Sequence, residues 1–522
     1  MRKRSLRFVM LMDKFMRVLG KKVRRLDLAS CLLFLVLVTI SAFLISEVHS
    51  ITNIYYSAVL RVKTSSAESD HTSNYDIDQQ IGPYSPGLEI GAGADDSGRQ
   101  SYLYAPSTIT SFVLSATDSS GTQTGASNPS HTRFNSSKPL PGTFFSMDWN
   151  HFIPSGTWPS VSFGGIRLWD NYASWQDIEK ANGTYNWNNL DKWLVAADAS
   201  HADVLYAFGR TPAWASLRPS EKCNYGAGCA APPSDVDSGD NIWKAFVTAL
   251  VQHSLSSPAA HIKYYEMWNE PDCTKGCTWT GTDVQLVTMA RDAYHVIHTL
   301  DPDALVLGPS PHGLSVVKWL QAYYAAGGAA YQDIVAFHAY VGSHLDQLPL
   351  IVDNTRALMA QYGIGNQPLW VTEGNWGVTG LSSSQQVAYL AQEYIILWSK
   401  NVARVYWYSW DGGPQWGQLW TASTGINSAG VAYGLLENWL IGSVSPPSPC
   451  QQTGDATWNC TLTLSNGDPA EIIWNPNTSS KEAISPGFTT YRTLDSSAVN
   501  SIVGNTISLG NEPILLIASG KH

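Results

Sequence analysis

Short apolar segments alternate with longer amphipathic segments through the central part of the chain. The apolar segments are rich in Val, Ile, Leu, Phe and Trp and have few charges, which is typical of buried strands in a parallel sheet. We predict eight such strands. They cover residues 143–147, 165–169, 204–208, 263–268, 305–308, 334–337, 369–372 and 405–408.

Between these strands, apolar residues recur with the spacing of an amphipathic helix. The predicted helices cover residues 190–199, 242–253, 283–300, 316–326, 352–362 and 384–400. Eight strand–helix units over roughly 300 residues predict an α/β fold, the (β/α)8 TIM barrel. A doubly wound open sheet is the alternative, and it is disfavoured because no glycine-rich phosphate loop follows the first strand.

The pattern changes on both sides of the barrel. Residues 51–139 are rich in Ser, Thr, Gly and Asn and contain too few apolar residues to bury a core, so we expect a partly disordered linker. After residue 442, alternating segments at 461–464, 470–474, 489–493 and 513–518 predict a small antiparallel, β-sandwich-like domain. The expected domains are residues 1–50, 51–139, 140–441 and 442–522.

Basic residues crowd the N-terminal end of the chain. Residues 1–25 hold ten of the 32 Lys and Arg and one acidic residue, and an apolar run follows at 28–45. Basic flanks stay cytoplasmic, and the run is about long enough to span a bilayer. We expect a membrane anchor, slightly favoured, or a long signal peptide cleaved near 48–50. The rest of the chain is then exported, either anchored at the cell surface or secreted.

The remainder of the chain is acidic. Residues 26–522 contain 22 Lys and Arg against 41 Asp and Glu, a formal charge of −19. This balance argues against nucleic acid as a partner. The chain also has 21 Trp and 24 Tyr, which either fill the core or line a cleft where sugar rings stack on aromatic faces.

Two predicted strands end in glutamate. Residues 264–271 have the sequence Tyr-Tyr-Glu-Met-Trp-Asn-Glu-Pro, which puts Glu270 at the end of the fourth strand. Residues 368–374, Pro-Leu-Trp-Val-Thr-Glu-Gly, put Glu373 at the end of the seventh. The C-terminal strand ends of a barrel meet at one mouth, so the two carboxylates should face each other. One protonated and one ionised carboxyl group are what cleavage of a glycosidic bond requires.

An acid/base on strand four and a nucleophile on strand seven is the arrangement of the clan A glycoside hydrolases. Within that clan, the chain resembles glycoside hydrolase family 39 and its bacterial relatives that act on exopolysaccharide. The resemblance covers about residues 140–440 and the β module after them. The segments that carry it are 165–170, 268–271, 336–340 and 369–373, of which Trp-Asn-Glu-Pro at 268–271 is the most specific.

The resemblance implies a retaining β-glycosidase that works by double displacement, with Glu270 as acid/base and Glu373 as nucleophile. Glu270 must then stay protonated near neutral pH, so we expect its pKa to be raised. Arg167 would keep Glu373 ionised, or else form a structural ion pair. The two carboxyl groups should lie about 5–5.5 Å apart, since inversion needs a wider gap. No cofactor and no metal ion is expected.

The resemblance also implies roles for neighbouring side chains. Asn269 would bond the 2-hydroxyl of the sugar, and Tyr340 would donate to Glu373. His338, on the same strand face as Tyr340, is either a ligand contact or a satisfied core histidine. Glu266 is expected to be a buried structural partner rather than the acid.

Aromatic residues near the strand ends are further candidates for substrate binding. Trp169, Asp170 and Trp376 would line outer subsites, and Trp407 or Trp410 would form the platform beneath the reacting sugar. The last two lie three residues apart, so one of them should belong to the core unless the strand carries a bulge.

Six of the seven cysteines fall into close pairs, which predict three local disulfides in an oxidising compartment. The pairs are Cys223/Cys229, Cys273/Cys277 and Cys450/Cys460. Metal binding is the weaker alternative, because no pair has the Cys-x-x-Cys spacing or an evident set of His partners. The second pair would stiffen the loop that carries Glu270.

These residues favour cleavage of β-glycosidic bonds in an extracellular or envelope polysaccharide or oligosaccharide. Endo action is slightly favoured, because aromatic residues are spread over several loops. A non-catalytic carbohydrate-binding surface protein is the alternative from another class, disfavoured by the intact carboxylate pair. A transglycosylase would share the covalent intermediate. The sugar and the oligomeric state stay open at this point.

Overall fold

The structure, a computed structural model, describes residues 138–150, 158–273, 278–477 and 480–518. The predicted N-terminal anchor and almost all of the predicted linker lie outside these ranges. Among the described residues, no helix combines the length and the apolar character needed to cross a membrane.

Eight parallel strands form the central sheet, hydrogen-bonded in the order β10-β11-β12-β1-β2-β5-β8-β9. A parallel bridge between Leu307 and Ile334 joins the two ends of this order, so the sheet closes on itself. The strands are β1 (Phe145–Asp148), β2 (Gly165–Leu168), β5 (Asp203–Ala207), β8 (Ile262–Glu266), β9 (Leu305–Leu307), β10 (Val335–His338), β11 (Leu369–Gly374) and β12 (Arg404–Trp407). All eight coincide with predicted strands, in the arrangement of a TIM barrel.

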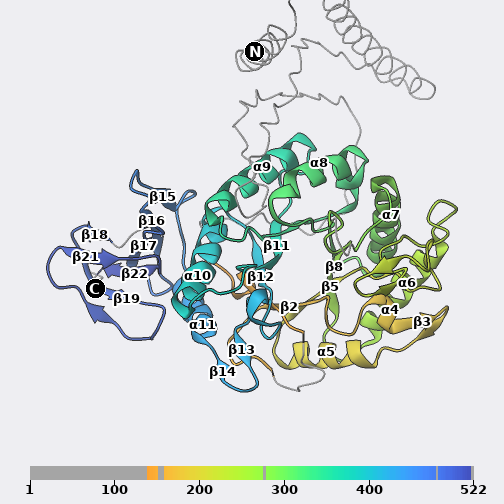
Figure 1. Cartoon of the computed structure of the whole chain (residues 1–522), viewed down its shortest axis with the longest axis horizontal. Coiled ribbons are helices and arrows are strands. Elements are labelled where there is room, and N and C mark those ends of the chain that lie inside the picture. Colours follow the sequence, from red (N-terminus) through yellow and green to blue (C-terminus); the bar gives the residue numbers. More distant parts are fainter. Residues whose placement is uncertain (1–137, 151–157, 274–277, 478–479, 519–522) are drawn as a thin grey trace, which may run out of the picture. The chain divides into compact units, whose positions relative to one another are not determined.

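Helices surround the strands (Figure 1). They are α4 (Trp175–Ile178), α5 (Asn188–Ala199), α6 (Asn241–Ser256), α7 (Asp283–Leu300), α8 (Val316–Ala325), α9 (Leu348–Gln361), α10 (Ser383–Ser399) and α11 (Ser428–Leu440). Six of them are the predicted helices. Thr282 and Ser382 start α7 and α10 through capping boxes with Gln285 and Gln385, which satisfy free amides of the first turns.

Two apolar clusters hold the barrel together. One lies inside the ring of strands and includes Leu205, Leu307 and Trp370. The other packs the outer faces of the strands against the helices. Arg167 pairs in register with Leu205, and Glu266 with Leu307. Residues in register on neighbouring strands share a face, so both charged side chains point into the barrel, where only mutual pairing makes their burial tolerable.

Three short hairpins decorate the loops: β3 (Glu179–Ala181) with β4 (Thr184–Tyr185), β6 (Lys222–Cys223) with β7 (Gly226–Ala227), and β13 (Trp420–Thr421) with β14 (Gly425–Ile426). The second hairpin follows β5 and matters for the site below.

The C-terminal part is the predicted antiparallel β domain. Its six-stranded sheet has the order β15-β16-β17-β22-β19-β20, and β18 pairs separately with β21. The strands are β15 (Cys450–Gln452), β16 (Trp458–Thr463), β17 (Pro469–Trp474), β18 (Ser480–Ala483), β19 (Phe488–Arg492), β20 (Asn500–Ser501), β21 (Thr506–Leu509) and β22 (Ile514–Ala518). The four predicted strands correspond to β16, β17, β19 and β22.

Candidate active site

Glu270 follows β8 in a backbone conformation that few residues adopt. Its φ is 42°, in the left-handed region, where a residue with a side chain is strained and is often found at a functional site. Neighbouring groups hold it there. The Glu270 amide donates to the carbonyl of Ser310 at 3.0 Å, and the Thr278 hydroxyl donates to the Glu270 carbonyl at 2.8 Å. The carboxylate is therefore presented by a tethered backbone rather than by a free loop.

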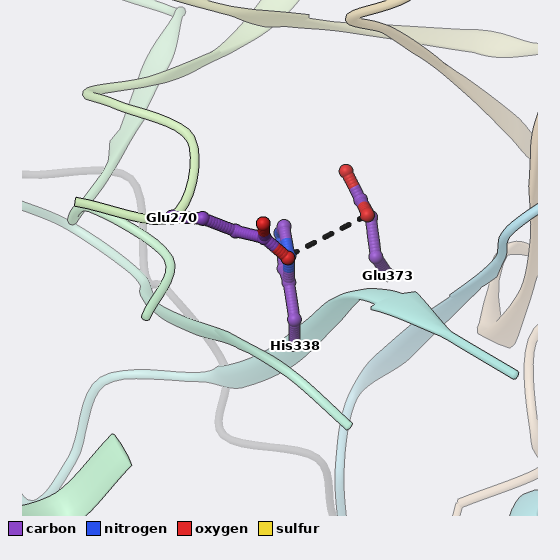
Figure 2. A group of neighbouring side chains, drawn as sticks. All are labelled: Glu270, His338 and Glu373. Carbon is purple, nitrogen blue, oxygen red and sulfur yellow. Dashed lines mark hydrogen bonds and ion pairs between the residues drawn. The ribbon is translucent and has the colours of Figure 1, made fainter. Parts of the chain in front are cut away.

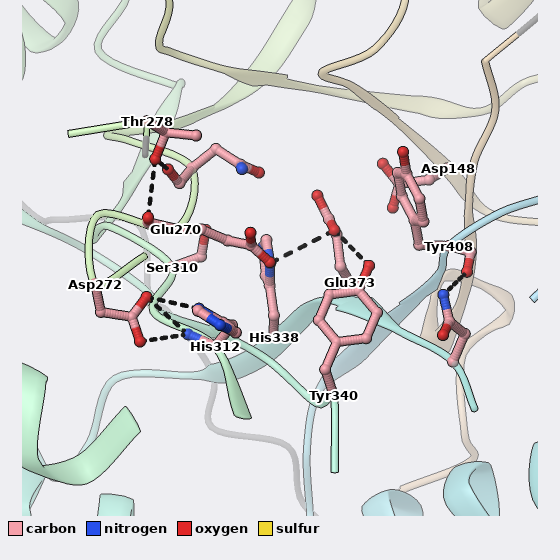
Figure 3. Close-up of polar contacts among 12 residues, drawn as sticks. Asp148, Glu270, Asp272, Thr278, Ser310, His312, His338, Tyr340, Glu373 and Tyr408 are labelled. Atoms are coloured by element: carbon pink, nitrogen blue, oxygen red, sulfur yellow. Dashed lines mark hydrogen bonds and ion pairs between the residues drawn. The ribbon is translucent and has the colours of Figure 1, made fainter. Parts of the chain in front are cut away.

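Glu373 lies within the last two residues of β11 and is 4% exposed. The Tyr340 hydroxyl donates to its Oε2 at 2.6 Å, as the sequence predicted (Figure 3). Its Oε1 accepts a hydrogen bond from Arg167. Both oxygens thus face donors, which is the environment of an ionised carboxylate.

Arg167 links the buried polar groups of the barrel mouth. Nε and Nη2 donate to the two oxygens of Glu266 at 3.1 and 2.6 Å, a bidentate pair. Nη2 also donates to Asn269 Oδ1 at 2.7 Å, and Nη1 contacts Glu373 and, at 3.4 Å, Asp148. Because the Asn269 oxygen accepts from Arg167, its amide NH2 is turned toward other acceptors, such as a sugar hydroxyl. Glu266 is the buried partner that the sequence indicated.

His338 lies between the two glutamates (Figure 2). Its Nδ1 is 2.9 Å from Glu270 Oε1 and 3.5 Å from Glu373 Oε2, while its Nε2 is 3.5 Å from Arg167 Nη2. Arg167 has only hydrogens to offer, so we assign the acceptor role to Nε2 and the hydrogen to Nδ1. His338 therefore donates to Glu270. One ligand atom from each of Glu270, His338 and Glu373 lies within 4.8 Å of the others.

The pKa values of the two glutamates differ from the sequence-based expectation. Burial is the largest single effect and would raise the pKa of Glu270, but the hydrogen bond from His338 and the charges of His338 and His312 together hold this pKa below its ordinary value. Burial raises the pKa of Glu373, against the opposing effects of His338 and Arg167. The expectation of a raised Glu270 pKa is thus wrong for the substrate-free site. The reason is the histidine contact, which comes from a strand two places away in the barrel order.

Three side chains of the described residues could together offer ligand atoms to a metal ion: Glu270, His338 and Glu373. Glu373 already accepts from Arg167 and Tyr340, so the guanidinium supplies the positive charge that a metal would bring. The group thus combines two carboxyl groups and an imidazole that contacts both of them.

The predicted tryptophan platforms are not at the open face. Trp376, Trp407 and Trp410 are each at most 1% exposed. Trp407 packs toward α10, 6.1 Å from the ring of Tyr394, and its indole donates to the Gly417 carbonyl at 2.7 Å. Trp376 likewise donates to a backbone carbonyl, that of Pro414. Trp376 and Trp407 thus stiffen the loop after β12. The predictions that Trp407 or Trp410 forms the platform and that Trp376 lines an outer subsite are wrong, because all three side chains are buried.

Tyr408, rather than Trp407 or Trp410, is the aromatic residue near the end of β12 that lines a pocket. It is two residues beyond Tyr406, which points into the barrel, and its hydroxyl donates to Asp170 at 2.6 Å. The period of two along the strand could have identified it. Asp170 also pairs with Arg210, and Trp169 lies beneath the Arg210 guanidinium, 4.2 Å away. Arg210 was not a candidate from the sequence, because it lies in a loop without a motif.

A second unpredicted pair lies beside Glu270. His312 Nδ1 is 2.9 Å from Asp272, whose other oxygen accepts from Ser315 at 2.5 Å. Burial opposes the charge on His312, but the Asp272 bond and the nearby carboxylates raise its pKa to about 9. A positive imidazolium therefore stands close to Glu270 and contributes to its lowered pKa.

Two of the predicted disulfides are present. Cys223–Cys229 closes the β6–β7 hairpin, and Cys450–Cys460 joins β15 to β16. The third predicted pair includes Cys277, which lies outside the described residues.

Residues 230–433 match the family model described as Glycosyl hydrolase catalytic core, a segment that contains both Glu270 and Glu373. The match defines the class of the protein: the barrel carries a glycosidase catalytic core, and the chain is a glycosidase. No curated protein matches the sequence.

Solved structures share the fold at low sequence identity. A monomeric β-xylosidase from Caulobacter crescentus CB15 matches with a TM-score of 0.53 and 14% identity, over 74% of this chain and 98% of its own. A glucosidase from Croceicoccus marinus gives 0.52 and 14%, over 74% and 98%. A family 39 glycoside hydrolase from the gut symbiont Bacteroides cellulosilyticus WH2 gives 0.52 and 15%, over 68% and 76%. The resemblance to family 39 and clan A thus extends to the fold.

Proposed function

We propose that this glycosidase cleaves β-glycosidic bonds with retention of anomeric configuration, with Glu270 as acid/base and Glu373 as nucleophile. One observation carries the proposal: one oxygen of the Glu270 carboxyl group, just beyond β8, lies within 4.8 Å of one oxygen of the Glu373 carboxyl group, near the end of β11. A nearest-oxygen distance of this size fits a closely spaced carboxyl pair. Retaining enzymes hold their carboxyl groups about 5–5.5 Å apart, whereas inverting enzymes need about 6.5–9.5 Å to admit a water.

In the first displacement, Glu373 attacks the anomeric carbon while Glu270 protonates the departing oxygen. In the second, Glu270 removes a proton from water, which attacks the same carbon and releases the sugar from Glu373. The NH2 group of Asn269, held by Arg167, is placed to bond a hydroxyl beside the reacting carbon.

Two carboxylates this close hold one proton between them over a range of pH. The lowered pKa of Glu270 and the raised pKa of Glu373 favour this proton on Glu373 before the sugar binds. The reaction requires the other arrangement, with Glu373 ionised and the proton on Glu270, and the hydrogen bonds that Arg167 and Tyr340 donate to Glu373 support it. In that state the Glu270 oxygen can turn its hydrogen away from His338 and toward the leaving group. His338 then keeps the carboxyl in place through its Nδ1 hydrogen.

The proposed substrate is an extracellular or envelope polysaccharide or oligosaccharide, because the N-terminal pattern predicts export and the two disulfides are of the kind that persist outside the cytoplasm. Endo action stays a prediction. Part of its support is lost, since Trp376, Trp407 and Trp410 are buried and cannot serve as open subsites. The named activities of two structural neighbours, a glucosidase and a β-xylosidase, make glucosides and β-xylosides the first substrates to test.

The test compares the wild-type protein with Glu373→Ala on xylan, mannan, glucan, galactan and arabinan oligosaccharides and on aryl β-glycosides. NMR follows the anomer first released. A β-anomer from the wild type and no turnover by the variant support retention with Glu373 as nucleophile. An α-anomer as first product would refute retention, and equal turnover by both proteins would refute the role of Glu373. Glycan binding by both proteins without turnover would favour a binding module.

A further inference from the structure

A small polar pocket opens at the C-terminal ends of β1, β2, β5 and β12, where its lining residues follow the strands. It has a volume of about 320 Å³, at the lower end of the range for ligand pockets, which fits a group the size of one or two sugar units. Its polar lining comes from Asn150, Asp170, Arg210 and Tyr408. The exposed ring of Trp416, 43% accessible, forms part of its rim.

The pocket lies on the nucleophile's side of the site. In Figure 3, Glu373 lies between Glu270 on one side and Tyr408 on the other. The Tyr408 amide donates at 3.0 Å to the carbonyl of Gly374, the residue after Glu373, so Tyr408 lies next to the nucleophile's strand end. The sugar attacked by Glu373 remains on that side, while the leaving group protonated by Glu270 departs on the other. The pocket therefore faces the glycone.

Arg210 is held in one orientation from three directions. Its guanidinium lies over the ring of Trp169 at 4.2 Å and over that of Tyr225 at 3.7 Å, and one edge is paired with Asp170. Tyr225 belongs to the β6–β7 hairpin closed by Cys223–Cys229. The side chain is only 8% exposed.

Both members of the Asp170–Arg210 pair keep hydrogen-bonding capacity. Among the described residues, Arg210 donates a side-chain hydrogen bond to Asp170. This bond uses one of the five N–H groups of the guanidinium, so other N–H groups can donate to a ligand. Each Asp170 oxygen accepts one bond, from Arg210 or from Tyr408, and has a second lone pair. A guanidinium donor next to a carboxylate acceptor is complementary to two neighbouring hydroxyl groups, one accepting and one donating.

We propose that Asp170 and Arg210 form a binding site for a pair of hydroxyl groups on the glycone of a neutral sugar, and so set the sugar specificity of this enzyme. This inference rests on the proposed function and adds the substrate class. The surroundings disfavour an acidic sugar. Asp170 neutralises Arg210, and the other residues that line the pocket bring no further positive charge. A uronate carboxylate entering the pocket would therefore find no uncompensated cation among the lining residues.

The test uses the full-length protein, Asp170→Asn and Arg210→Met, with Arg218→Met as a matched control. Arg218 pairs with Glu221 and Thr280 and does not line the pocket. The substrates are p-nitrophenyl β-glycosides of neutral sugars and of glucuronic acid, followed by monodeoxy analogues of the best neutral sugar.

We expect the neutral glycosides to be preferred and each pocket variant to lose about 10- to 100-fold in kcat/KM, the cost of one hydrogen bond to a charged group. The control should stay near wild type. For the wild type, kcat/KM on at least one deoxy analogue should be lower than on the parent sugar by a similar factor. For Asp170→Asn this decrease in kcat/KM should be much smaller, because the residue that binds the missing hydroxyl is already changed. A general folding defect would not produce this selective loss of a penalty.

Preference for the glucuronide, or equal deoxy penalties in wild type and Asp170→Asn, would overturn the proposal. If the wild type turns over no glycoside, the pocket is tested by calorimetry, which compares the binding of neutral oligosaccharides by the wild type and by Asp170→Asn. Weaker binding by Asp170→Asn would support the pocket while refuting the hydrolase, and equal binding would refute the pocket too.

Discussion

Replacing Tyr340 by phenylalanine removes one hydrogen bond from Glu373 and leaves the size of the side chain almost unchanged. The bond is 2.6 Å long and ends on a buried carboxylate oxygen, so it belongs to the strong, charge-assisted kind. Such bonds contribute about 1.5–3 kcal/mol. If this stabilises the ionised nucleophile, kcat/KM should fall roughly 10- to 150-fold. The donor also lowers the pKa of Glu373, which burial raises, so its loss raises that pKa further.

Glu373 acts as the carboxylate, so activity falls as the pH drops through its pKa. A higher pKa moves the acidic limb of the pH–kcat/KM profile toward higher pH in Tyr340→Phe. The assay is kcat/KM on an aryl β-glycoside from pH 4 to 9. The matched control is Tyr323→Phe, which removes a buried hydroxyl with no hydrogen-bond partner among the described residues, in α8. An unmoved acidic limb with full activity in Tyr340→Phe would refute the reasoning.

Three further predictions concern stability. Arg167→Met leaves buried carboxylates, Glu266 foremost, without their cation, and should cost about 3–5 kcal/mol in urea unfolding; an unchanged midpoint would contradict this. Burial raises the pKa of Glu437 to about 8, so the folded state holds a proton that the unfolded state releases, and stability declines as pH rises from about 4 to 8. The free energy of unfolding of Glu437→Gln should therefore increase relative to that of the wild type as the pH rises across that window, by at most about 5 kcal/mol. A difference between the two proteins that does not change with pH would rule out the linkage. Replacing Cys223 and Cys229 together by serine should lower stability by about 2 kcal/mol in thermal unfolding, and no loss would show that the hairpin is held without the bond.

Local pattern was sufficient for the architecture. All eight barrel strands lie where apolar runs predicted them, because a strand buried on both faces requires such a run whatever its neighbours are. The ends of β8 and β11 put Glu270 and Glu373 at one mouth for the same reason, since parallel strands of a barrel end on the same side. The two described disulfides join cysteines six and ten residues apart, a separation that leaves few other partners within reach.

The surroundings of individual side chains could be predicted less well from the sequence. The strand period of two places Tyr408 on the face of Tyr406, yet attention to residue type favoured Trp407 and Trp410, which pack into the core. The sequence around Arg210 did not indicate a role for this residue, because its partners Asp170 and Tyr225 come from the end of another strand and from a hairpin.

The sequence by itself thus determined the barrel, the two catalytic candidates and their place at the strand ends, all of which follow from periodicities of a few residues. Only the tertiary structure decided which way the pKa of Glu270 moves, because that depends on His338, 68 residues away, and on the charge of His312. It also decided that Arg167 reaches Glu373 across 206 residues of chain. Electrostatic and hydrogen-bond energies depend on distances of a few ångströms between groups far apart in sequence, and those distances exist only once the barrel has closed.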